Sequence, residues 1–258
     1  MNKLFVVSDV HSFLTPLKEA LNEAGFDPNN EEHWLVSCGD LFDRGPESKE
    51  LLQYIMSLDR KILVRGNHDL LLDACCMREF PYSHDNHNGT VTTIKDLGGW
   101  GSNQNFVECC ANTWNSLAAY RNTLVNYFET KNYIFVHSFV PIVVTYDESA
   151  SKPWHKTGKQ YAFMEDWRNA SATDWEEAMW VNPFELAWQG LNKTGKTIVF
   201  GHWHCSAGWH LKEGISEFGD NARWTIYHDT DRQIIGIDRC TVHTNKVNVL
   251  VIEDDFIN

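Results

Sequence analysis

The sequence predicts an α/β protein with a helical insertion near residues 78–131. In the first third, short apolar runs alternate with helical patterns, which is typical of a parallel sheet with helices on its faces. In the last third, apolar runs follow one another across short loops, which favours antiparallel strands. No repeat, low-complexity segment or linker divides the chain, so we expect one domain over residues 1–258.

The first third is expected to contain three strands and three helices. The strands are Leu4–Val7, Trp34–Val36 and Lys61–Val64, and the helices are Thr15–Ala24, Glu47–Leu58 and one that includes Leu70–Cys76. Apolar side chains at helical spacing support the first helix, and Gly25 stands where a helix C-cap belongs. Pro46 marks the start of the second helix.

The alternation stops between residues 78 and 131. We expect polar loops at His84–Gly89 and Gly98–Gly101 and a helix at Phe106–Ala119, in an insertion that walls the functional pocket. Strands should follow at Tyr133–Val136, Thr197–Phe200, Trp224–Tyr227, Ile234–Ile237 and Val247–Ile252, the last three pairing antiparallel. Residues 146–195 are polar and rich in tryptophan, with only scattered helical signal.

Composition restricts the possible partners. The chain has 258 residues, enough for a sizeable core, and a net charge of −13, which repels nucleic acid and anionic membranes. No apolar stretch approaches the ~20 residues of a membrane span, and the first apolar run leads directly into candidate ligands rather than a cleavable leader. The seven cysteines are odd in number, so we expect reduced thiols and a cytoplasmic location.

Five polar pieces each follow a short apolar run. They are Asp9-Val10-His11, Gly39–Gly45, Gly66–Asp69, His137 and Gly201–His204. In open sheets, ligands bind outside the carboxyl ends of the strands, so these pieces are expected to converge on one pocket. Their oxygen and nitrogen ligands suit two divalent ions better than a thiolate site would.

Two of the pieces have a spacing that suits ion binding. In an extended chain, residues two apart point to the same side, so Asp9 and His11 could reach one ion while Val10 enters the core. His202 and His204 repeat the pattern, with the intervening tryptophan directed away. Either pair alone occurs by chance in many proteins, so spacing is suggestive rather than sufficient.

The second and third pieces supply ligands and reaction chemistry together. Asp40 could bridge two ions ~3.5–4 Å apart, and Asp43 is better placed to orient a histidine. Arg44 presents a planar fork of donors that suits phosphate oxygens. Asn67 offers a neutral oxygen ligand, and His68 beside it could donate a proton.

Taken singly, each piece has a plainer interpretation. His137 alone fits a hydrogen-bonded, half-buried histidine, and the other pieces fit surface turns and ion pairs. Five independent pieces in the order of one site make a shared metal centre the better interpretation.

In this order the pieces resemble the signature of the calcineurin-like metallophosphoesterase superfamily, which is D-x-H, G-D-x-x-D-R, G-N-H-[DE], H and G-H-x-H. The longer G-D-x-x-D-R-G-P and R-G-N-H-D stretches, with Phe135–Pro141, are similar to serine/threonine phosphoprotein phosphatases, particularly bacterial and phage members. The resemblance covers most of the chain except parts of 78–131 and 146–195. It implies a four-layer α/β/β/α sandwich around a dinuclear centre.

The resemblance also implies a role for each residue. One ion would be held by Asp9, His11, Asp40 and His204, and the other by Asp40, Asn67, His137 and His202. His68 would be the general acid, oriented by Asp43, and Arg44, Asn67 and His68 would bind the phosphate. A hydroxide shared by the ions would attack phosphorus, with manganese expected and iron, zinc or nickel as alternatives.

The chain departs from the protein-phosphatase branch at one place. That branch carries a second phosphate-binding arginine after a tryptophan, where this chain has Asn182, and Arg168 nearby has the wrong spacing. We expect a phosphomonoesterase of the protein-phosphatase type, acting on a phosphoprotein or small phosphoester. The alternative is a nucleotide hydrolase, a dinucleoside polyphosphatase or phosphodiesterase, in which Trp100, Trp203 or Trp209 could stack on a base.

Two further interpretations remain. A non-catalytic scaffold of the same fold should have lost ligands or the acid histidine, and none of them is missing here. A separate metal site at His84–His87 competes with a solvated loop at the pocket rim.

Overall fold

Two mixed β-sheets form the centre of the computed structural model, which describes residues 2–146 and 159–256. The first sheet has the order β12-β1-β2-β3-β4. Its strands are β1 (Asn2–Val7), β2 (His33–Ser37), β3 (Lys61–Val64), β4 (Leu124–Val125) and β12 (Leu250–Asp254). β1 to β3 run parallel, as the sequence predicts, β4 continues in the same direction, and β12 runs antiparallel to β1.

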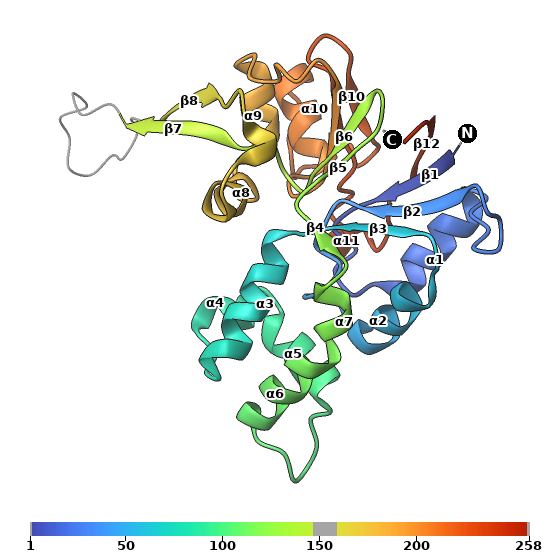
Figure 1. Ribbon diagram of the computed structural model, residues 1–258, viewed down its shortest axis with the longest axis vertical. Coiled ribbons are helices and arrows are strands. Elements are labelled where there is room, and N and C mark those ends of the chain that lie inside the picture. The colour runs from blue at the N-terminus through green and yellow to red at the C-terminus, as the bar shows by residue number, and fades with distance from the viewer. Residues whose placement is uncertain (1, 147–158, 257–258) are drawn as a thin grey trace.

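The second sheet has the order β10-β11-β9-β6-β5. Its strands are β5 (Phe128–Glu129), β6 (Tyr133–Phe135), β9 (Thr197–Phe200), β10 (Tyr227–Asp229) and β11 (Ile234–Gly236). β6, β9 and β11 are parallel, and β5 and β10 close the two edges antiparallel. A separate hairpin of β7 (Ile142–Tyr146) and β8 (Lys159–Phe163) projects away from this sheet (Figure 1).

The layers follow from the two-residue repeat of the strands, which sends successive side chains to opposite faces. In β1, Leu4 and Val6 join a buried cluster made largely of residues from both sheets, so the sheets pack face to face. Phe5 and Val7 instead join a cluster with the helices that cover the first sheet.

The second sheet divides its side chains in the same way. Val199 of β9 enters the cluster between the sheets, and its neighbours Ile198 and Phe200 enter a third cluster with helices on the outer face. Two sheets with a helical layer on each outer side make the expected four-layer arrangement, and Figure 1 shows these layers. The fold prediction is confirmed.

Helices cover both outer faces. On the first sheet lie α1 (Leu14–Glu23), α2 (Ser48–Ser57), α3 (Asn67–Arg78), α5 (Thr90–Gly98), α6 (Phe106–Ser116) and α7 (Ala118–Arg121). On the second lie α8 (Ala172–Ala178), α9 (Pro183–Trp188) and α10 (Cys205–Glu213), with a short 3-10 turn at Trp167–Asn169. The remaining helices are α4 (Ser83–His87) and α11 (Thr241–Thr244).

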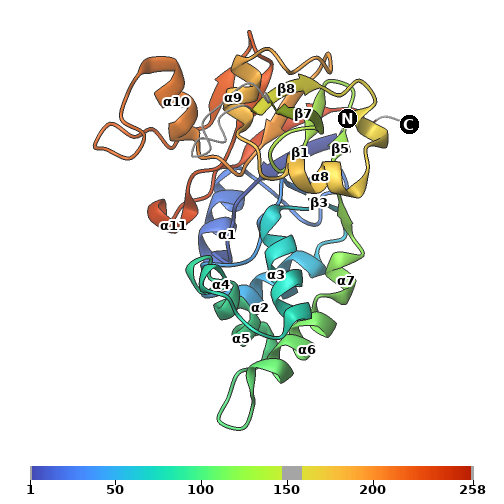
Figure 2. The same cartoon turned by 90° about the vertical axis from the view of Figure 1, so that its left-hand side faces the viewer.

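The predicted helical insertion is present as α4 to α7. Figure 2 shows these helices at the end of the molecule remote from the second sheet. They also contribute to the functional pocket, because Asn88 lines it and Thr90 bonds to the Asp43 carboxylate, which lies behind His68. The insertion therefore walls the pocket, as expected, rather than forming a detached unit.

Three local predictions were wrong. The strand expected at Val247–Ile252 is β12 and pairs with β1 in the other sheet, so it does not pair with β11. The strand expected to begin at Trp224 begins at Tyr227. The polar stretch at His84 is a helical turn, in which the Asp85 carboxylate accepts the backbone N–H of Tyr82.

Part of the tryptophan-rich stretch, residues 147–158, lies outside the described residues.

All seven cysteines are free, and six of them are buried, in agreement with the expected reduced thiols. Within the two described ranges, no helix combines the length and the apolar character required to cross a membrane.

Helices α5 and α6 pack closely because Gly98 of α5 has no side chain where the backbone of Cys109 passes. A Cβ on Gly98 would lie 2.5 Å from the carbonyl oxygen of Cys109, so we expect Gly98→Ala to lower the free energy of unfolding by about 1–3 kcal/mol. Gly101→Ala is the control, because its Cβ would meet no atom closer than 3.9 Å. Urea unfolding of both variants measures the difference, and equal stability would contradict the tight crossing.

Candidate metal centre

The predicted ligands leave their strands through backbone turns. Asp9, His11, Asp40 and His202 have φ values of 51°, 52°, 51° and 63°, in the left-handed region. The expected extended alternation of Asp9 and His11 is therefore wrong. The chain reverses at these residues and turns their side chains towards the pocket, at a conformational cost of about 1–2 kcal/mol per residue.

Two motif glycines allow the strand ends to approach each other. A Cβ on Gly201 would lie 2.0 Å from Oδ2 of Asp9, and one on Gly66 would lie 2.1 Å from Oδ1 of Asp40. No side chain can occupy either space while the carboxylates stay in place. The glycines of the third and fifth pieces thus serve packing between elements rather than turn formation.

Three histidine rings are anchored by the backbone. Nδ1 of His11 lies 2.9 Å from the carbonyl oxygen of Phe42, and Nδ1 of His137 lies 2.9 Å from that of Cys38. The ring of His202 bonds to the backbone of Trp180. A ring that donates one N–H to a carbonyl has its other nitrogen free as an acceptor, which is the usual arrangement of metal-binding histidines.

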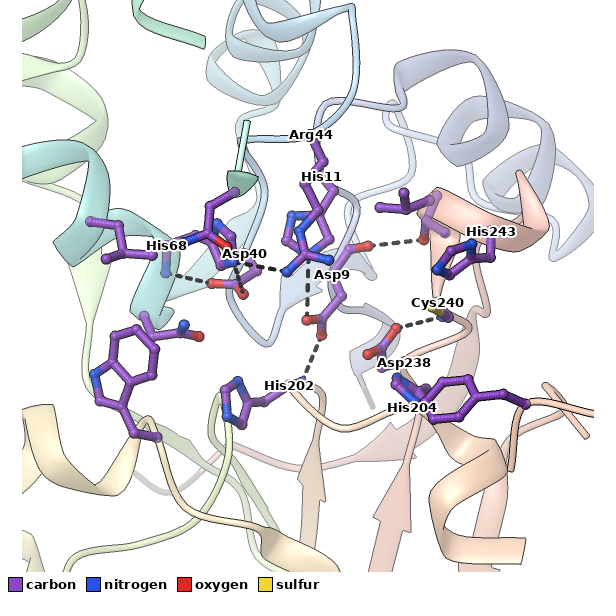
Figure 3. A pocket seen from close by; sticks show the side chains of 17 residues that line it. Asp9, His11, Asp40, Arg44, His68, His202, His204, Asp238, Cys240 and His243 are labelled. Atoms are coloured by element: carbon purple, nitrogen blue, oxygen red, sulfur yellow. Dashed lines mark hydrogen bonds and ion pairs between the residues drawn. The ribbon is translucent and has the colours of Figure 1, made fainter. Parts of the chain in front are cut away.

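Asp40 is the point where two groups of candidate ligands meet. One group is His11, Asp40 and His68, the other is Asp40, His137 and His202, and within each group the ligand atoms lie within 4.8 Å of one another. Oδ2 of Asp40 is 3.4 Å from Nε2 of His137, which in turn is 2.7 Å from Oδ1 of Asn67. Figure 3 shows Asp40 between His68 and His202.

Asp9 completes the central group from the end of β1. Its Oδ2 accepts the Ser8 hydroxyl at 2.5 Å and the backbone N–H of His202 at 2.9 Å, and its Oδ1 lies 3.9 Å from Nε2 of His11. Burial raises the pKa of Asp9 to about 6, and the Asp40 carboxylate adds to that rise. Two buried carboxylates therefore face each other, an arrangement that bound cations would stabilise.

Burial also keeps the histidines neutral. It lowers the pKa of His11 to about 3 and that of His202 to about 3. Burial opposes ionisation of Asp40 too, but the surrounding histidine rings, His137 first, lower the pKa of that carboxyl below its ordinary value. A neutral imidazole and an ionised carboxylate are the forms that bind metal ions.

His68 differs from the other histidines in its partners. Its Nδ1 lies 2.8 Å from the Asp43 carboxylate, and its Nε2 lies 3.3 Å from the Arg44 guanidinium. Burial opposes protonation of the ring, but Asp40 and Asp43 together raise the pKa of His68. The backbone N–H of His68, in the first turn of α3, also donates to Asp40. A raised pKa favours the protonated ring, which is the form that the predicted role as proton donor requires.

The insertion fixes the carboxylate behind that histidine. The Thr90 hydroxyl donates to Oδ2 of Asp43 at 2.6 Å, and the Thr93 hydroxyl accepts the backbone N–H of Asp43 at 3.1 Å. Both threonines belong to α5 and were not identified from the sequence, because neither lies near a motif. The helical insertion therefore orients His68 through Asp43.

Asp9, Asn67 and His204 are predicted ligands outside the two groups, but Asp9 contacts His11 and Asn67 contacts His137, whereas His204 has another partner. His204 lines the pocket, but its Nε2 lies 2.9 Å from the Glu217 carboxylate, which leaves Nδ1 as the ring nitrogen available to an ion. Figure 3 places it beside Asp238 and Cys240 rather than beside Asp40. Its role as a ligand stays a prediction.

The pocket around these groups has a volume of about 300 Å³. Besides the predicted residues, it is lined by Trp180, Asp238 and His243, which the sequence analysis did not select. Asp238 follows β11 as Asp9 follows β1, so its position after an apolar strand could have marked it. Trp180 and His243 carry no such signal.

The other sequence candidates lie outside this pocket. Arg168 is bound by Glu129 at 2.6 Å, and Asn182 caps α9 through its side-chain oxygen. The metal site weighed as an alternative at residues 84–87 does not form a cluster in the described part of the chain, where Asp85 is paired with Arg78. Arg44 is thus the only arginine or lysine among the described residues that line the pocket.

The donor set fits divalent cations. It consists of carboxylate oxygens, one amide oxygen and neutral imidazole nitrogens that converge on a shared carboxylate, and such ligands suit Mn, Fe, Zn or Ni. The buried carboxylates lack an arginine or lysine close enough to form an ion pair in the described chain, so a bound cation is the natural counter-charge.

Comparison with known proteins agrees with this geometry. The profile of the family described as calcineurin-like phosphoesterase matches residues 3–206, which contain all five pieces. A bis(5′-nucleosyl)-tetraphosphatase, symmetrical, of Thioalkalivibrio sulfidiphilus is 49% identical over 70 residues, 27% of this chain and 25% of that protein. The match thus spans only about a quarter of the relative's length.

Solved structures resemble the whole fold at low identity. One is a protein with an inferred diadenosine tetraphosphatase activity (TM-score 0.50, 17% identity, 100% of this chain and 95% of that chain). Another is a protein serine/threonine phosphatase from Saccharomyces cerevisiae (TM-score 0.51, 14% identity, 100% and 81%). At such identities these similarities concern the fold alone.

Asp9 provides a test of the buried charge. Because its pKa is about 6 in the folded chain against 3.8 ordinarily, its ionised form opposes folding at pH 7.5, by about 2–3 kcal/mol. We expect Asp9→Asn to stabilise chelator-treated protein at pH 7.5, and to lose this advantage as pH falls below about 4. With Mn²⁺ present the same variant should be the less stable one. Urea unfolding measures both, and destabilisation of equal size in both states would refute the interpretation.

Proposed function

The chain belongs to the calcineurin-like phosphoesterase family, and from this premise we propose that it is a metal-dependent hydrolase of phosphoric ester and anhydride bonds. The observation that carries the proposal is the pair of ligand groups that share Asp40. Two bound ions would supply an activated water as nucleophile and positive charge for the phosphate oxygens.

The assignment of ligands follows the anchored side chains. We assign one ion to Asp9, His11 and Asp40, with His204 as a further ligand through Nδ1, and the other to Asp40, Asn67, His137 and His202. The backbone bonds of His11, His137 and His202 support this division, because they leave the other ring nitrogens near the Asp40 carboxylate. Manganese is our choice of metal for the first assays.

The protein's own residues would bind and protonate the substrate. Arg44 would hold phosphate oxygens, since its guanidinium lies in the pocket and touches His68 at 3.3 Å. His68 would donate its Nε2 proton to the leaving oxygen, while Asp43, held by Thr90, keeps Nδ1 bonded and stabilises the charged ring. Asn67 would contribute a further polar contact to the phosphate.

Within this reaction class, we propose a dinucleoside polyphosphate as substrate, specifically a tetraphosphate that one water molecule cleaves symmetrically into two nucleoside diphosphates. The partial relatives named symmetrical tetraphosphatases favour this reading of the site over the protein-phosphatase type that the sequence analysis placed first. A further argument is that Arg44 has no second arginine beside it among the described residues that line the pocket, whereas the protein-phosphatase type is expected to have one.

A substrate panel tests the proposal. Metal-free protein reloaded with Mn²⁺ would be given diadenosine tetraphosphate, p-nitrophenyl phosphate, its bis ester and a phosphothreonine peptide. We expect diadenosine tetraphosphate to be the preferred substrate and ADP to be its only nucleotide product by ion-exchange chromatography. Production of AMP with ATP would exclude symmetrical cleavage, preference for the peptide would restore the protein-phosphatase interpretation, and no hydrolysis at all would favour a scaffold.

The proton donor can be tested by leaving-group chemistry. His68→Asn removes the acid, so turnover should fall by about 10²–10⁴-fold on an alkyl phosphate, whose leaving group needs a proton. The loss should be much smaller on p-nitrophenyl phosphate, whose leaving group departs as a stable anion. Elemental analysis should find metal retained, and an equal loss on both substrates would argue against the acid role.

A further inference from the structure

A second groove adjoins the central pocket. Its volume is about 410 Å³, within the range of about 300–1,000 Å³ typical of ligand sites. The side chains that line it come from β7, β8, the region of α8 and α9, and the fifth motif: Val144, Tyr161, Glu177, Trp180, Val181, Asn182, Glu185 and Trp203. Trp180 lines both the groove and the central pocket, so the two hollows meet at this residue.

Trp180 is positioned from the metal centre. The backbone of Trp180 bonds to the ring of His202, and the two rings lie 6.3 Å apart, nearly perpendicular at 86°. Trp180 is nevertheless 50% exposed, so it retains aromatic surface on which a planar group could stack. A ribose and its 5′-phosphates can bridge the separation between this ring and the ligand cluster.

The charges of the groove exclude a phosphate from it. Its described lining includes Glu177 and Glu185 but no lysine, arginine or histidine. No described residue forms a hydrogen bond or ion pair with either carboxylate, so both can accept hydrogen bonds from a ligand. The groove therefore suits a group that carries N–H donors, and the exposed ring of Trp180 favours an aromatic one.

Asn182 supplies the complementary donor. Its side-chain oxygen accepts the backbone N–H groups of Phe184 and Glu185 at 3.1 and 3.3 Å, which leaves its amide nitrogen to donate. A purine presents an amino group or ring N–H together with acceptor nitrogens. The groove offers the matching set, two carboxylates and one amide nitrogen beside an aromatic face.

We propose that this groove binds a purine base of the substrate, with Trp180 as the stacking surface and Asn182, Glu177 and Glu185 as hydrogen-bond partners. The proposal rests on the proposed dinucleoside polyphosphate substrate and names the residues that select it. Trp203, which the sequence analysis considered as a stacking residue, lines the same groove, whereas Trp100 and Trp209 do not.

Three variants test the stacking surface. In Trp180→Ala, the preference for diadenosine tetraphosphate over p-nitrophenyl phosphate, measured as the ratio of kcat/KM values, should fall about ten- to a hundredfold, mainly through KM. Trp180→Phe keeps an aromatic face and should restore most of the preference. Trp100→Ala is the matched control, because Trp100 is also 50% exposed but packs against Lys95 outside the groove, and it should keep the wild-type ratio.

A binding measurement separates this proposal from the proposed function. Adenosine has no phosphate, so its contact with metal-free protein depends on the base site alone. In saturation-transfer NMR, the purine protons of adenosine should receive saturation from wild-type protein and from the Trp100→Ala variant. The transfer should disappear with the Trp180→Ala variant. Adenosine contact without hydrolysis of diadenosine tetraphosphate would refute that substrate and leave a purine site in the groove supported.

Two results would overturn the base site. One is hydrolysis of diadenosine tetraphosphate with an unchanged substrate ratio in Trp180→Ala, together with unchanged adenosine contact. The other is a preference for a basic phosphothreonine peptide that disappears in the Glu177→Gln/Glu185→Gln double variant, since the groove would then hold a cationic side chain.

Discussion

The placement of the Asp40 carboxylate is the constraint on which the rest of the site depends. It is 2% exposed, it belongs to both ligand groups, and it accepts the first-turn N–H of His68 at 3.0 Å. A buried charge is tolerated only where nearby groups compensate it, so the surrounding histidines, the α3 terminus and the bare Cα of Gly66 form one unit with it. Displacement of any of these would leave the carboxylate uncompensated.

This constraint explains why the centre lies where the two sheets meet. The carboxyl ends of β1, β2 and β3 deliver Asp9, Asp40 and Asn67, and those of β6 and β9 in the second sheet deliver His137 and His202. The packed cluster between the sheets holds the two edges at a fixed separation, so ligands up to 193 positions apart in the chain can touch, as in the Asp9–His202 contact. The stability of the inter-sheet core is thus a condition for the geometry of the site.

The sequence predicted what strand ends and short motifs determine, and it failed where tertiary contacts decide. Alternation predicted the parallel order of β1 to β3, and their common edge predicted the approach of Asp40 and Asn67. The four layers and the arrival of His137 from the second sheet were expected from the family resemblance. The left-handed turns at Asp9 and His11 could not be anticipated, because non-glycine residues adopt them only when packing compensates their strain. β12 pairs with β1 across the whole length of the chain, a register that no local signal encodes.

Thr90 and Trp180 lack a motif for a related reason, since each matters only through a residue that the motifs do specify. Thr90 acts on Asp43, and Trp180 acts beside His202.

The separation of the central pocket from the acidic groove explains how a chain of net charge −13 could bind a polyanionic substrate. Phosphates would meet bound cations and Arg44 in the central pocket, whereas the acidic groove would meet only the uncharged base. The local charges would therefore orient the substrate, because a substrate bound in the opposite direction would place its phosphates against Glu177 and Glu185.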